Sequence, residues 1–233
     1  MITILMAVFN GEKYLSDQIE SILNQTVKEW KLVIQDDCST DTTAEIAMSY
    51  AAKFPDKIAF HQRYTPSGSA KSNFFSMIEY ADTDYIMTSD QDDIWLPSKI
   101  EVTLNKFSEI EKNIGRDIPI LVHTDLKVVD SELNILGESL FKYQNLNSDN
   151  DCLNKLLVQN IVTGCTMMTN RALISKVRTE PEHAIMHDWW FALVASAFGT
   201  IGYVPQATIL YRQHGDNEVG AKNSLSELMS RKH

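Results

Sequence analysis

Aspartates that follow predicted strands are the residues in this sequence best suited to chemistry. Two lie at 36–37, directly after an apolar run, and a DQDD segment follows another such run at 90–93. In open α/β sheets the carboxyl ends of parallel strands meet at one edge, so these carboxylates should share a rim. Because closely spaced carboxylates repel one another, the rim predicts a bound divalent cation, Mg²⁺ or Mn²⁺, together with the oxygens of a diphosphate ligand.

A structural role is the alternative for each group of aspartates. Asp36 and Asp37 could cap a turn, and Asp92 and Asp93 could cap the helix that is predicted to open near Leu96, as aspartates after strands often do. Two such groups on one rim favour function over capping. Other nucleotide folds fit poorly, because the turn after the first strand lacks GxGxxG and the chain contains no GxxxxGK[ST] segment.

Strand-like and helix-like segments alternate in the first half of the chain, which is typical of a parallel sheet with crossover helices. The predicted strands cover residues 2–8, 31–35, 58–62 and 84–89. The predicted helices cover residues 12–25, the stretch between the caps at 39–42 and Pro55, the stretch from Ser69 or Ser72 through Ile78, and a long segment from Leu96 to about Lys112. This order predicts an α/β fold whose rim carries the aspartates.

The second half has a less regular pattern. Strands are predicted at 120–129, 165–169 and 203–212, and helices at 152–158 and 188–198. No internal repeat or Gly/Pro/Ser-rich linker interrupts the 233 residues, which favours a single domain over 1–233 with a nucleotide half (1–112) and an acceptor-side half (113–233). The segment from Ser224 resembles a helix start that stops abruptly, so we expect the chain to be cut from a longer protein.

Composition narrows the class of protein. The hydrophobic fraction of 44% and charged fraction of 22% are those of a globular fold, and the net charge of −10 argues against nucleic acid as a partner. Three cysteines without CxxC spacing suggest neither a disulfide framework nor a zinc site, which fits the cytoplasm. Residues 1–9 are too short to span a bilayer and lack the basic start of a signal peptide.

The order of several motifs resembles the family 2 inverting glycosyltransferases of GT-A fold. The resemblance rests on AVFNGEKYLSDQIESILNQT at 7–26, DDCSTDTT at 36–43, GSAKSNF at 68–74, SDQDDIW at 89–95, TGCTMM at 163–168, HDWW at 187–190 and YRQHGDN at 211–217. In the residues of the DQD, HDWW and QHG segments, the chain most resembles bacterial rhamnosyltransferase-like members that build surface polysaccharides. The resemblance implies a Rossmann-like, mostly parallel central sheet flanked by helices, with a smaller C-terminal acceptor region.

The same resemblance implies roles for residues of the nucleotide half. Phe9 and Asn10 would border the nucleotide pocket, Asp37 would accept a hydrogen bond from the pyrimidine edge, and Asp90 would lie near the ribose. A carboxylate suits an imide N–H. Lys71 falls where the family often has a basic residue near the diphosphate, with a solvated helix residue as the alternative.

For metal and catalysis, the resemblance implies that Asp92 holds the cation and that His214 completes the site. Asp188 stands at the position of the catalytic base, although an N-cap aspartate before Trp189 fits the spacing equally. Trp189 and Trp190 could stack on an acceptor sugar, but adjacent tryptophans at a helix start normally send one ring into the core. At most one of the two rings is expected to face the sugar.

Together with the acidic rim, the resemblance implies a metal-dependent inverting glycosyltransferase that uses Mn²⁺ or Mg²⁺. It would move a hexose or deoxyhexose, rhamnose-like, from a UDP- or dTDP-sugar to a glycan or lipid-linked acceptor in surface polysaccharide synthesis. The expected location is the cytoplasm, which leaves room for peripheral association with the inner face of a bacterial membrane. The alternative is a non-catalytic sugar-nucleotide or glycan binding protein on the same scaffold, which would need no base at Asp188. A nucleotidyltransferase would need a basic glycine-rich loop after the first strand.

Overall fold

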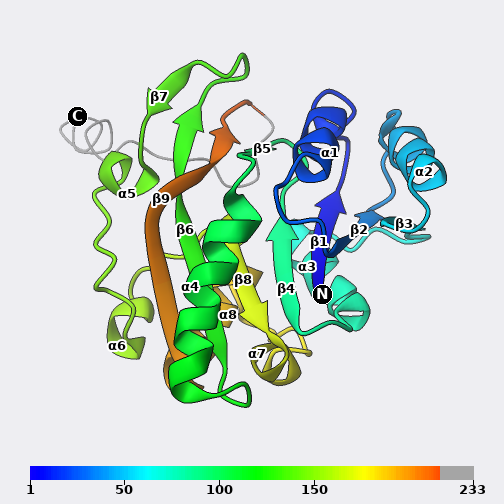
Figure 1. Cartoon of the computed structure of the whole chain (residues 1–233). Coiled ribbons are helices and arrows are strands. Elements are labelled where there is room, and N and C mark those ends of the chain that lie inside the picture. Colours follow the sequence, from blue (N-terminus) through cyan, green and yellow to red (C-terminus); the bar gives the residue numbers. More distant parts are fainter. Residues whose placement is uncertain (216–233) are drawn as a thin grey trace.

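The computed structural model describes residues 1–215, whose nine strands form one sheet (Figure 1). The strands are β1 (Ile2–Val8), β2 (Trp30–Asp36), β3 (Ile58–Gln62), β4 (Tyr85–Ser89), β5 (Ile94–Trp95), β6 (Ile120–Val129), β7 (Ile135–Gly137), β8 (Met167–Asn170) and β9 (Thr200–Arg212). The helices are α1 (Leu15–Leu23), α2 (Thr43–Lys53), α3 (Ala70–Met77), α4 (Lys99–Ile114), α5 (Leu140–Tyr143), α6 (Leu153–Leu156), α7 (Arg171–Lys176) and α8 (His187–Phe198), with the 3₁₀ turns η1 (Ile78–Tyr80) and η2 (Gly164–Thr166).

The strands run in the order β3-β2-β1-β4-β8-β6-β9-β5, and β7 pairs with β6. From β3 to β4 every pair is parallel, whereas β8 is antiparallel to both β4 and β6. Parallel pairing returns between β6 and β9. The carboxyl ends of β2, β1 and β4 therefore lie next to one another, as the pattern of aspartates predicted.

Two hydrophobic cores cover the two faces of the sheet, and alternating residues of β1 show the division. Ile2, Ile4 and Met6 pack with α1, α2 and α4, whereas Leu5 packs with α3, α7 and α8. In Figure 1, α4 crosses the near face and α8 lies behind the sheet. Because each fully buried Leu, Ile or Met side chain contributes roughly 1.5–3 kcal/mol, these faces determine the register of the strands.

The short strand β5 connects the DQDD segment to β9. Ile94 and Trp95 pair with Leu210 and Ile209 of β9. This pairing holds residues 90–93, which precede β5, against the carboxyl end of β9. Two chain segments about half the sequence apart are thereby brought to the same place.

The predicted α/β fold is confirmed, and the strands at 2–8, 58–62 and 120–129 have the predicted bounds. The predicted strand at 165–169 starts instead at Met167, because residues 164–166 form the turn η2. The long helix starts at Lys99 rather than at Leu96, after the N-cap Ser98. The sequence pattern gave no indication of β5, β7, α5 or α7.

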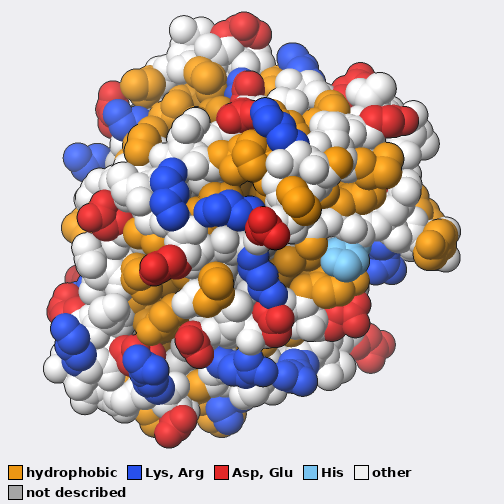
Figure 2. Space-filling view, turned by 45° about the vertical axis from the view of Figure 1, so that its right-hand side comes forward, with side chains coloured by type: hydrophobic (Ala, Val, Ile, Leu, Met, Phe, Trp, Pro, Cys, Tyr) orange, Lys and Arg blue, Asp and Glu red, His pale blue; other side chains and the backbone are white. Residues whose placement is uncertain are grey.

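The surface drawn in Figure 2 shows basic side chains interspersed with acidic ones. Among the described residues, the helices are all too short or too polar to cross a bilayer.

Candidate active site

The DQDD segment is attached to the end of β1 through its glutamine. Gln91 accepts a hydrogen bond from the Phe9 N–H through Oε1 (2.8 Å) and donates to the Phe9 carbonyl through Nε2 (2.9 Å). A side chain on Gly11 would meet this amide, because its Cβ would lie 2.4 Å from Gln91 Oε1. The phenyl ring of Phe9 remains 53% exposed at the rim, where a planar base could pack against it.

Asn10 joins the turn after β1 to the loop after β2. It has a positive φ of 47°, a conformation that Asn tolerates better than most residues. Its backbone N–H donates to Ser39 Oγ, and its Oδ1 accepts from the Thr40 N–H, both at 2.9 Å. The Asn10 side chain thus fixes the loop at the predicted nucleotide pocket rather than pointing freely into it.

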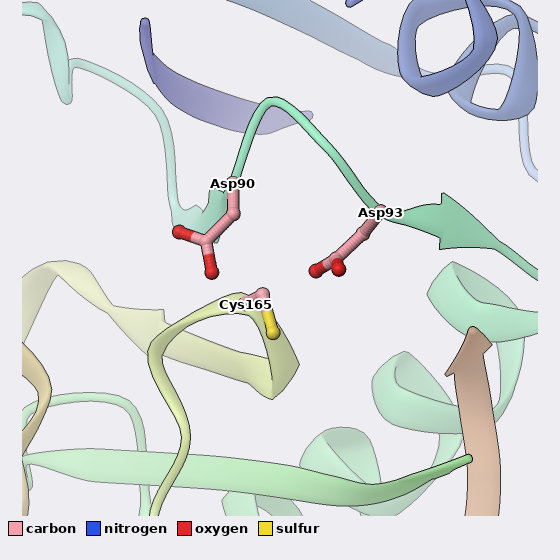
Figure 3. Close-up of side chains that lie close together, drawn as sticks. All are labelled: Asp90, Asp93 and Cys165. Carbon is pink, nitrogen blue, oxygen red and sulfur yellow. The ribbon is translucent and has the colours of Figure 1, made fainter. Parts of the chain in front are cut away.

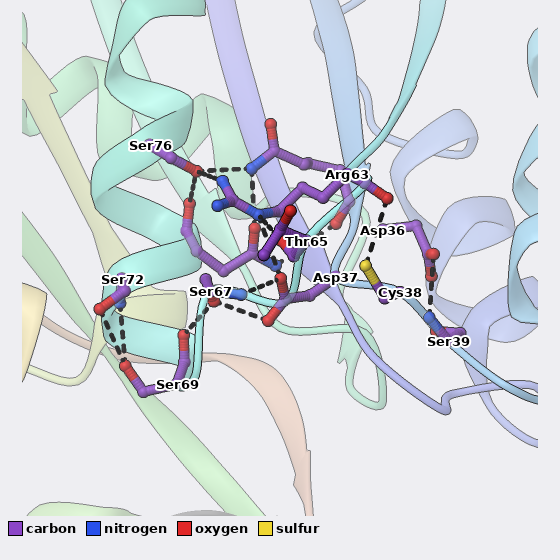
Figure 4. A network of polar contacts seen from close by, with 12 residues as sticks. Asp36, Asp37, Cys38, Ser39, Arg63, Thr65, Ser67, Ser69, Ser72 and Ser76 are labelled. Atoms are coloured by element: carbon purple, nitrogen blue, oxygen red, sulfur yellow. Dashed lines mark hydrogen bonds and ion pairs between the residues drawn. The ribbon is translucent and has the colours of Figure 1, made fainter.

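The two aspartates after β2 have different environments (Figure 4). Asp36 is buried and accepts from the Ser39 N–H, so the turn-capping interpretation holds for this residue. Asp37 is 7% exposed and accepts from both the N–H (2.7 Å) and the Oγ–H (2.6 Å) of Ser67. Arg63 Nε lies 3.2 Å from Asp37 Oδ1. A carboxylate has about four acceptor positions, so Asp37 can still accept one more hydrogen bond.

Asp92 and His214 lie together, although 122 residues separate them. Asp92 Oδ2 is 2.8 Å from His214 Nε2, and both side chains are about seven-eighths buried. This contact is a hydrogen bond in the structure, and a divalent cation held by the same two atoms would replace it. A carboxylate oxygen and an imidazole nitrogen are both atoms that can bind divalent metals.

Asp90, Asp93 and Cys165 form a neighbouring cluster, with ligand atoms within 4.8 Å of one another (Figure 3). Asp93 is fully buried and accepts from the Arg212 N–H at 3.1 Å, not from a helix N–H as a capping role would require. Burial, followed by the charges of Asp92 and Asp90, raises the pKa of Asp93 well above its usual range. Burial likewise raises the pKa of the Cys165 thiol. Burial thus disfavours the charged forms of both Asp93 and Cys165.

Asp188 is the second residue of α8, because the N-cap is Met186. The N-cap alternative is therefore wrong for this residue. Asp188 Oδ2 accepts from the Gly164 N–H (2.9 Å) and Oδ1 from the Trp189 N–H (2.6 Å). The residue is only 9% exposed, and burial raises its pKa to about 7 although both backbone N–H groups act in the opposite direction. A carboxyl group with a pKa near the working pH suits general base catalysis.

Gly164 donates to Asp188 and lies close to the His187 ring. The sequence did not suggest a role for Gly164 or His187. The His187 ring is buried and stacks on Phe74 with 4.1 Å between ring centroids. A Cβ on Gly164 would lie 2.9 Å from His187 Nε2. Glycine at 164 therefore lets the backbone come close enough to donate to Asp188.

The two tryptophans after Asp188 have different surroundings. Trp189 is partly buried, and its Nε1–H donates to the Leu156 carbonyl at 2.6 Å. Trp190 packs against the core on the α8 side of the sheet. Both residues are partly buried, and acceptor stacking by either ring stays a prediction.

Lys71 joins the nucleotide half to the segment before α8. Its Nζ lies 3.0 Å from Glu180 Oε1 and donates to the Ala184 carbonyl at 2.9 Å. Ser72 Oγ also donates to Glu180 (3.0 Å). Lys71 is thus an ion-paired residue rather than a solvated helix residue, and its contact with a diphosphate stays a prediction.

The raised pKa of Asp188 leads to a testable pH dependence. The folded protein keeps this proton up to about pH 7, whereas the unfolded chain releases it near 3.8. The free energy of unfolding should therefore fall, relative to Asp188→Asn, as the pH rises from 4 to 7, and level off above that. Urea unfolding of both proteins across this range measures the difference. Parallel curves would mean that Asp188 ionises in the folded protein as it does in the unfolded chain.

Comparisons with known proteins agree with this geometry. The Glycosyl transferase family 2 model matches residues 3–178. The dTDP-rhamnosyl transferase RfbG of Shigella flexneri is 27% identical over 226 residues, covering 94% of this chain and 75% of RfbG. The putative glycosyltransferase EpsE of Bacillus subtilis (strain 168) is 39% identical over 100 residues, covering 43% of this chain and 36% of EpsE.

Solved structures show the same fold. TarS 1–349 of S. aureus in complex with UDP matches with a TM-score of 0.69 and 20% identity, covering 91% of this chain and 60% of that one. The mannosyltransferase PcManGT of Pyrobaculum calidifontis, in complex with GDP-Man and Mn²⁺, matches with a TM-score of 0.68 and 13% identity, covering 94% and 58%. The chain thus spans about three fifths of the length of these GT-A glycosyltransferases. With three quarters of its residues matched by the family model, and with the aspartate rim in place, the chain belongs to glycosyl transferase family 2.

Proposed function

We propose that the chain is the catalytic region of a metal-dependent inverting glycosyltransferase. One observation carries the proposal: the turn η2 contacts both the Asp188 carboxylate and the DQDD segment. Gly164 donates its N–H to Asp188, and the next residue, Cys165, lies against Asp90 and Asp93. The turn η2 thus links Asp188, whose pKa is raised to about 7, to the DQDD segment, which is suited to a diphosphate and its cation.

In the proposed reaction, Asp188 accepts the proton of an acceptor hydroxyl group as that oxygen attacks the anomeric carbon. Attack from the face opposite the leaving nucleotide inverts the configuration. Asp92 and His214 would hold the cation, which supplies positive charge to the leaving diphosphate when bound. Asp37 holds the loop at 63–67 and would accept from the base, while Phe9 and Asn10 border it.

The proposed donor is a UDP- or dTDP-linked hexose or deoxyhexose. Uracil and thymine carry the same imide N–H, so an acceptor at Asp37 suits both. RfbG is named a dTDP-rhamnosyl transferase, and TarS is bound to UDP in its crystal structure. A panel of nucleotide sugars with Mn²⁺, scored by release of the nucleoside diphosphate, tests the proposal. Release from none of them, with intact nucleotide binding, would favour the binding-protein alternative.

The proposed acceptor is a glycan or a lipid-linked sugar in surface polysaccharide synthesis. Relatives include the minor teichoic acid biosynthesis protein GgaB and the putative teichuronic acid biosynthesis glycosyltransferase TuaG of Bacillus subtilis (strain 168), at 32% and 30% identity over 48% and 47% of this chain. A cytoplasmic site of action, with peripheral contact to the membrane that carries such acceptors, is part of the same proposal. Trp189, next to Asp188, is the ring we propose for acceptor contact.

Asp37→Ala should raise the KM for the donor more than it lowers kcat. A hydrogen bond to a charged group contributes roughly 1.5–3 kcal/mol, which corresponds to about 10- to 100-fold in affinity. Steady-state kinetics with the donor found by the panel measures both constants. The control is Ser67→Ala, which removes one donor to Asp37 but keeps the carboxylate. An equal rise in KM in both variants would indicate that Asp37 only holds the loop.

A further inference from the structure

Arg212 is a buried arginine at the carboxyl end of β9, only 3% exposed. It contacts the DQDD segment twice: its backbone N–H donates to Asp93 Oδ1 (3.1 Å) and its Nε donates to the Asp92 carbonyl (2.8 Å). Its Nη1 donates to the Ser131 carbonyl at 2.7 Å. One side chain therefore joins β9, the segment after β4 and the turn between β6 and β7.

The guanidinium group also lies against the Tyr14 ring, which in turn contacts His214. Its central carbon is 4.3 Å from the centroid of the Tyr14 ring. The Tyr14 ring in turn lies 5.0 Å from the His214 ring, centroid to centroid. Because His214 Nε2 is 2.8 Å from Asp92 Oδ2, the contacts form a closed circuit from Arg212 through Tyr14 and His214 to Asp92 and back.

The chemistry of these contacts suits positioning rather than substrate binding. Two of the guanidinium nitrogens donate to backbone carbonyls, whose places are fixed by the chain, and a guanidinium group presents its donors in a rigid fork. Its third nitrogen lies 3.4 Å from Asp17 Oδ2, at the start of α1. With 3% exposure, the side chain has little surface left for a ligand.

We propose that Arg212 is a positioning residue that fixes the geometry of the Asp92–His214 pair. It holds Asp92 through its backbone carbonyl, and it holds His214 through the Tyr14 ring and through the chain two residues away. This inference rests on the proposed role of Asp92 and His214 in holding a divalent cation. Residues that orient metal ligands typically change metal affinity by about 10- to 100-fold when they are replaced.

The test is the affinity for Mn²⁺, measured by electron paramagnetic resonance with and without UDP or dTDP. Arg212→Met, which keeps the bulk of the side chain but none of its donors, should weaken Mn²⁺ binding by about 10- to 100-fold. Arg212→Lys, with its charge and one flexible donor group, should fall between Met and wild type. In Arg212→Ala, millimolar guanidinium chloride should restore part of the lost affinity, which a general loss of stability would not allow.

A variant destabilised elsewhere separates positioning from stability. Asn170 is buried and caps α7, and it pairs with Tyr85 at the end of β4 opposite to Ser89. Asn170→Ala should lower the melting temperature and leave Mn²⁺ affinity unchanged. If Arg212→Met does not fold, Tyr14→Leu, which interrupts the circuit but keeps Arg212, should still weaken Mn²⁺ binding.

Two outcomes would overturn the inference, and they are distinguishable. Unchanged Mn²⁺ affinity in Asp92→Asn and His214→Ala would remove the proposed cation site, and the positioning role with it. Weakened binding in those two variants, with wild-type affinity in the folded Arg212 and Tyr14 variants, would remove the positioning role alone.

Discussion

Asp188→Asn should lower sugar transfer by about 10²- to 10⁴-fold while the affinity for the donor stays unchanged, because an amide cannot accept the proton of the acceptor hydroxyl. Asparagine keeps the size of the side chain and one oxygen acceptor for the Gly164 or Trp189 N–H. It also removes a charge that burial disfavours, since the pKa of Asp188 is raised to about 7. The variant should therefore fold at the pH of the assay. Turnover, donor binding and thermal melting are measured on the same preparation.

The control for this variant is Thr88→Val. Thr88 Oγ1 donates to the Gly164 carbonyl at 2.6 Å, so it holds the same turn that Asp188 holds through the Gly164 N–H. If Asp188 serves only to anchor η2, both variants should reduce turnover to a similar extent. If Asp188 is the base, Thr88→Val should keep most of the activity, and turnover of wild-type enzyme should rise with pH through about 7 as the carboxyl group ionises.

The sequence predicted the parts of the site that depend on local pattern and strand order. Strands with apolar runs end at Val8, Asp36 and Ser89, and their parallel pairing places the residues that follow on one rim. One turn was also predictable, because Asp36 accepts a hydrogen bond from the Ser39 N–H. The sequence had suggested this capping role as the alternative for Asp36 and Asp37. These features depend on hydrophobic periodicity and on short-range hydrogen bonds, which a single sequence displays.

The contacts between distant segments could not be predicted in the same way. Asp92 meets His214 because Ile94 and Trp95 pair with β9, and a strand of two residues has no periodicity to detect. Lys71 meets Glu180 across 109 positions of the chain, and neither of its two sequence-based interpretations included an ion pair. In both cases the partner is chosen by the tertiary fold.

Burial of charged groups was the other feature hidden in the sequence. Arginine is mostly exposed in proteins, so Arg212 inside the YRQHGDN motif gave no sign of a buried side chain. The signal available was its place at the end of a predicted strand, three residues after the buried Ile209. The raised pKa of Asp188 is similar, because it depends on the burial of that carboxyl group in the folded chain.

Asp92→Asn should abolish the dependence of nucleotide binding on Mn²⁺ and lower sugar transfer by at least about 10²-fold. In the proposed site Asp92 would supply an oxygen ligand beside His214, and replacing even a residue that only supports a metal ligand typically costs about 10- to 100-fold in affinity. Calorimetric titration of UDP or dTDP, with Mn²⁺ and then with excess chelator, measures the effect. Wild-type protein in chelator should bind as weakly as the variant does with Mn²⁺.

The rim carries several carboxylates, so a control must separate the charge of Asp92 from its proposed role as a metal ligand. If Asp92 acted only through its charge, removing it would reduce repulsion of the diphosphate and tighten nucleotide binding in chelator and in Mn²⁺ alike. Glu12→Gln removes a charge from the segment after β1 and keeps an acceptor for the Thr42 hydroxyl. It should leave the Mn²⁺ dependence intact. Equal nucleotide affinity with Mn²⁺ and with chelator in the wild-type protein would contradict the cation bridge, and the acidic rim would then need another explanation.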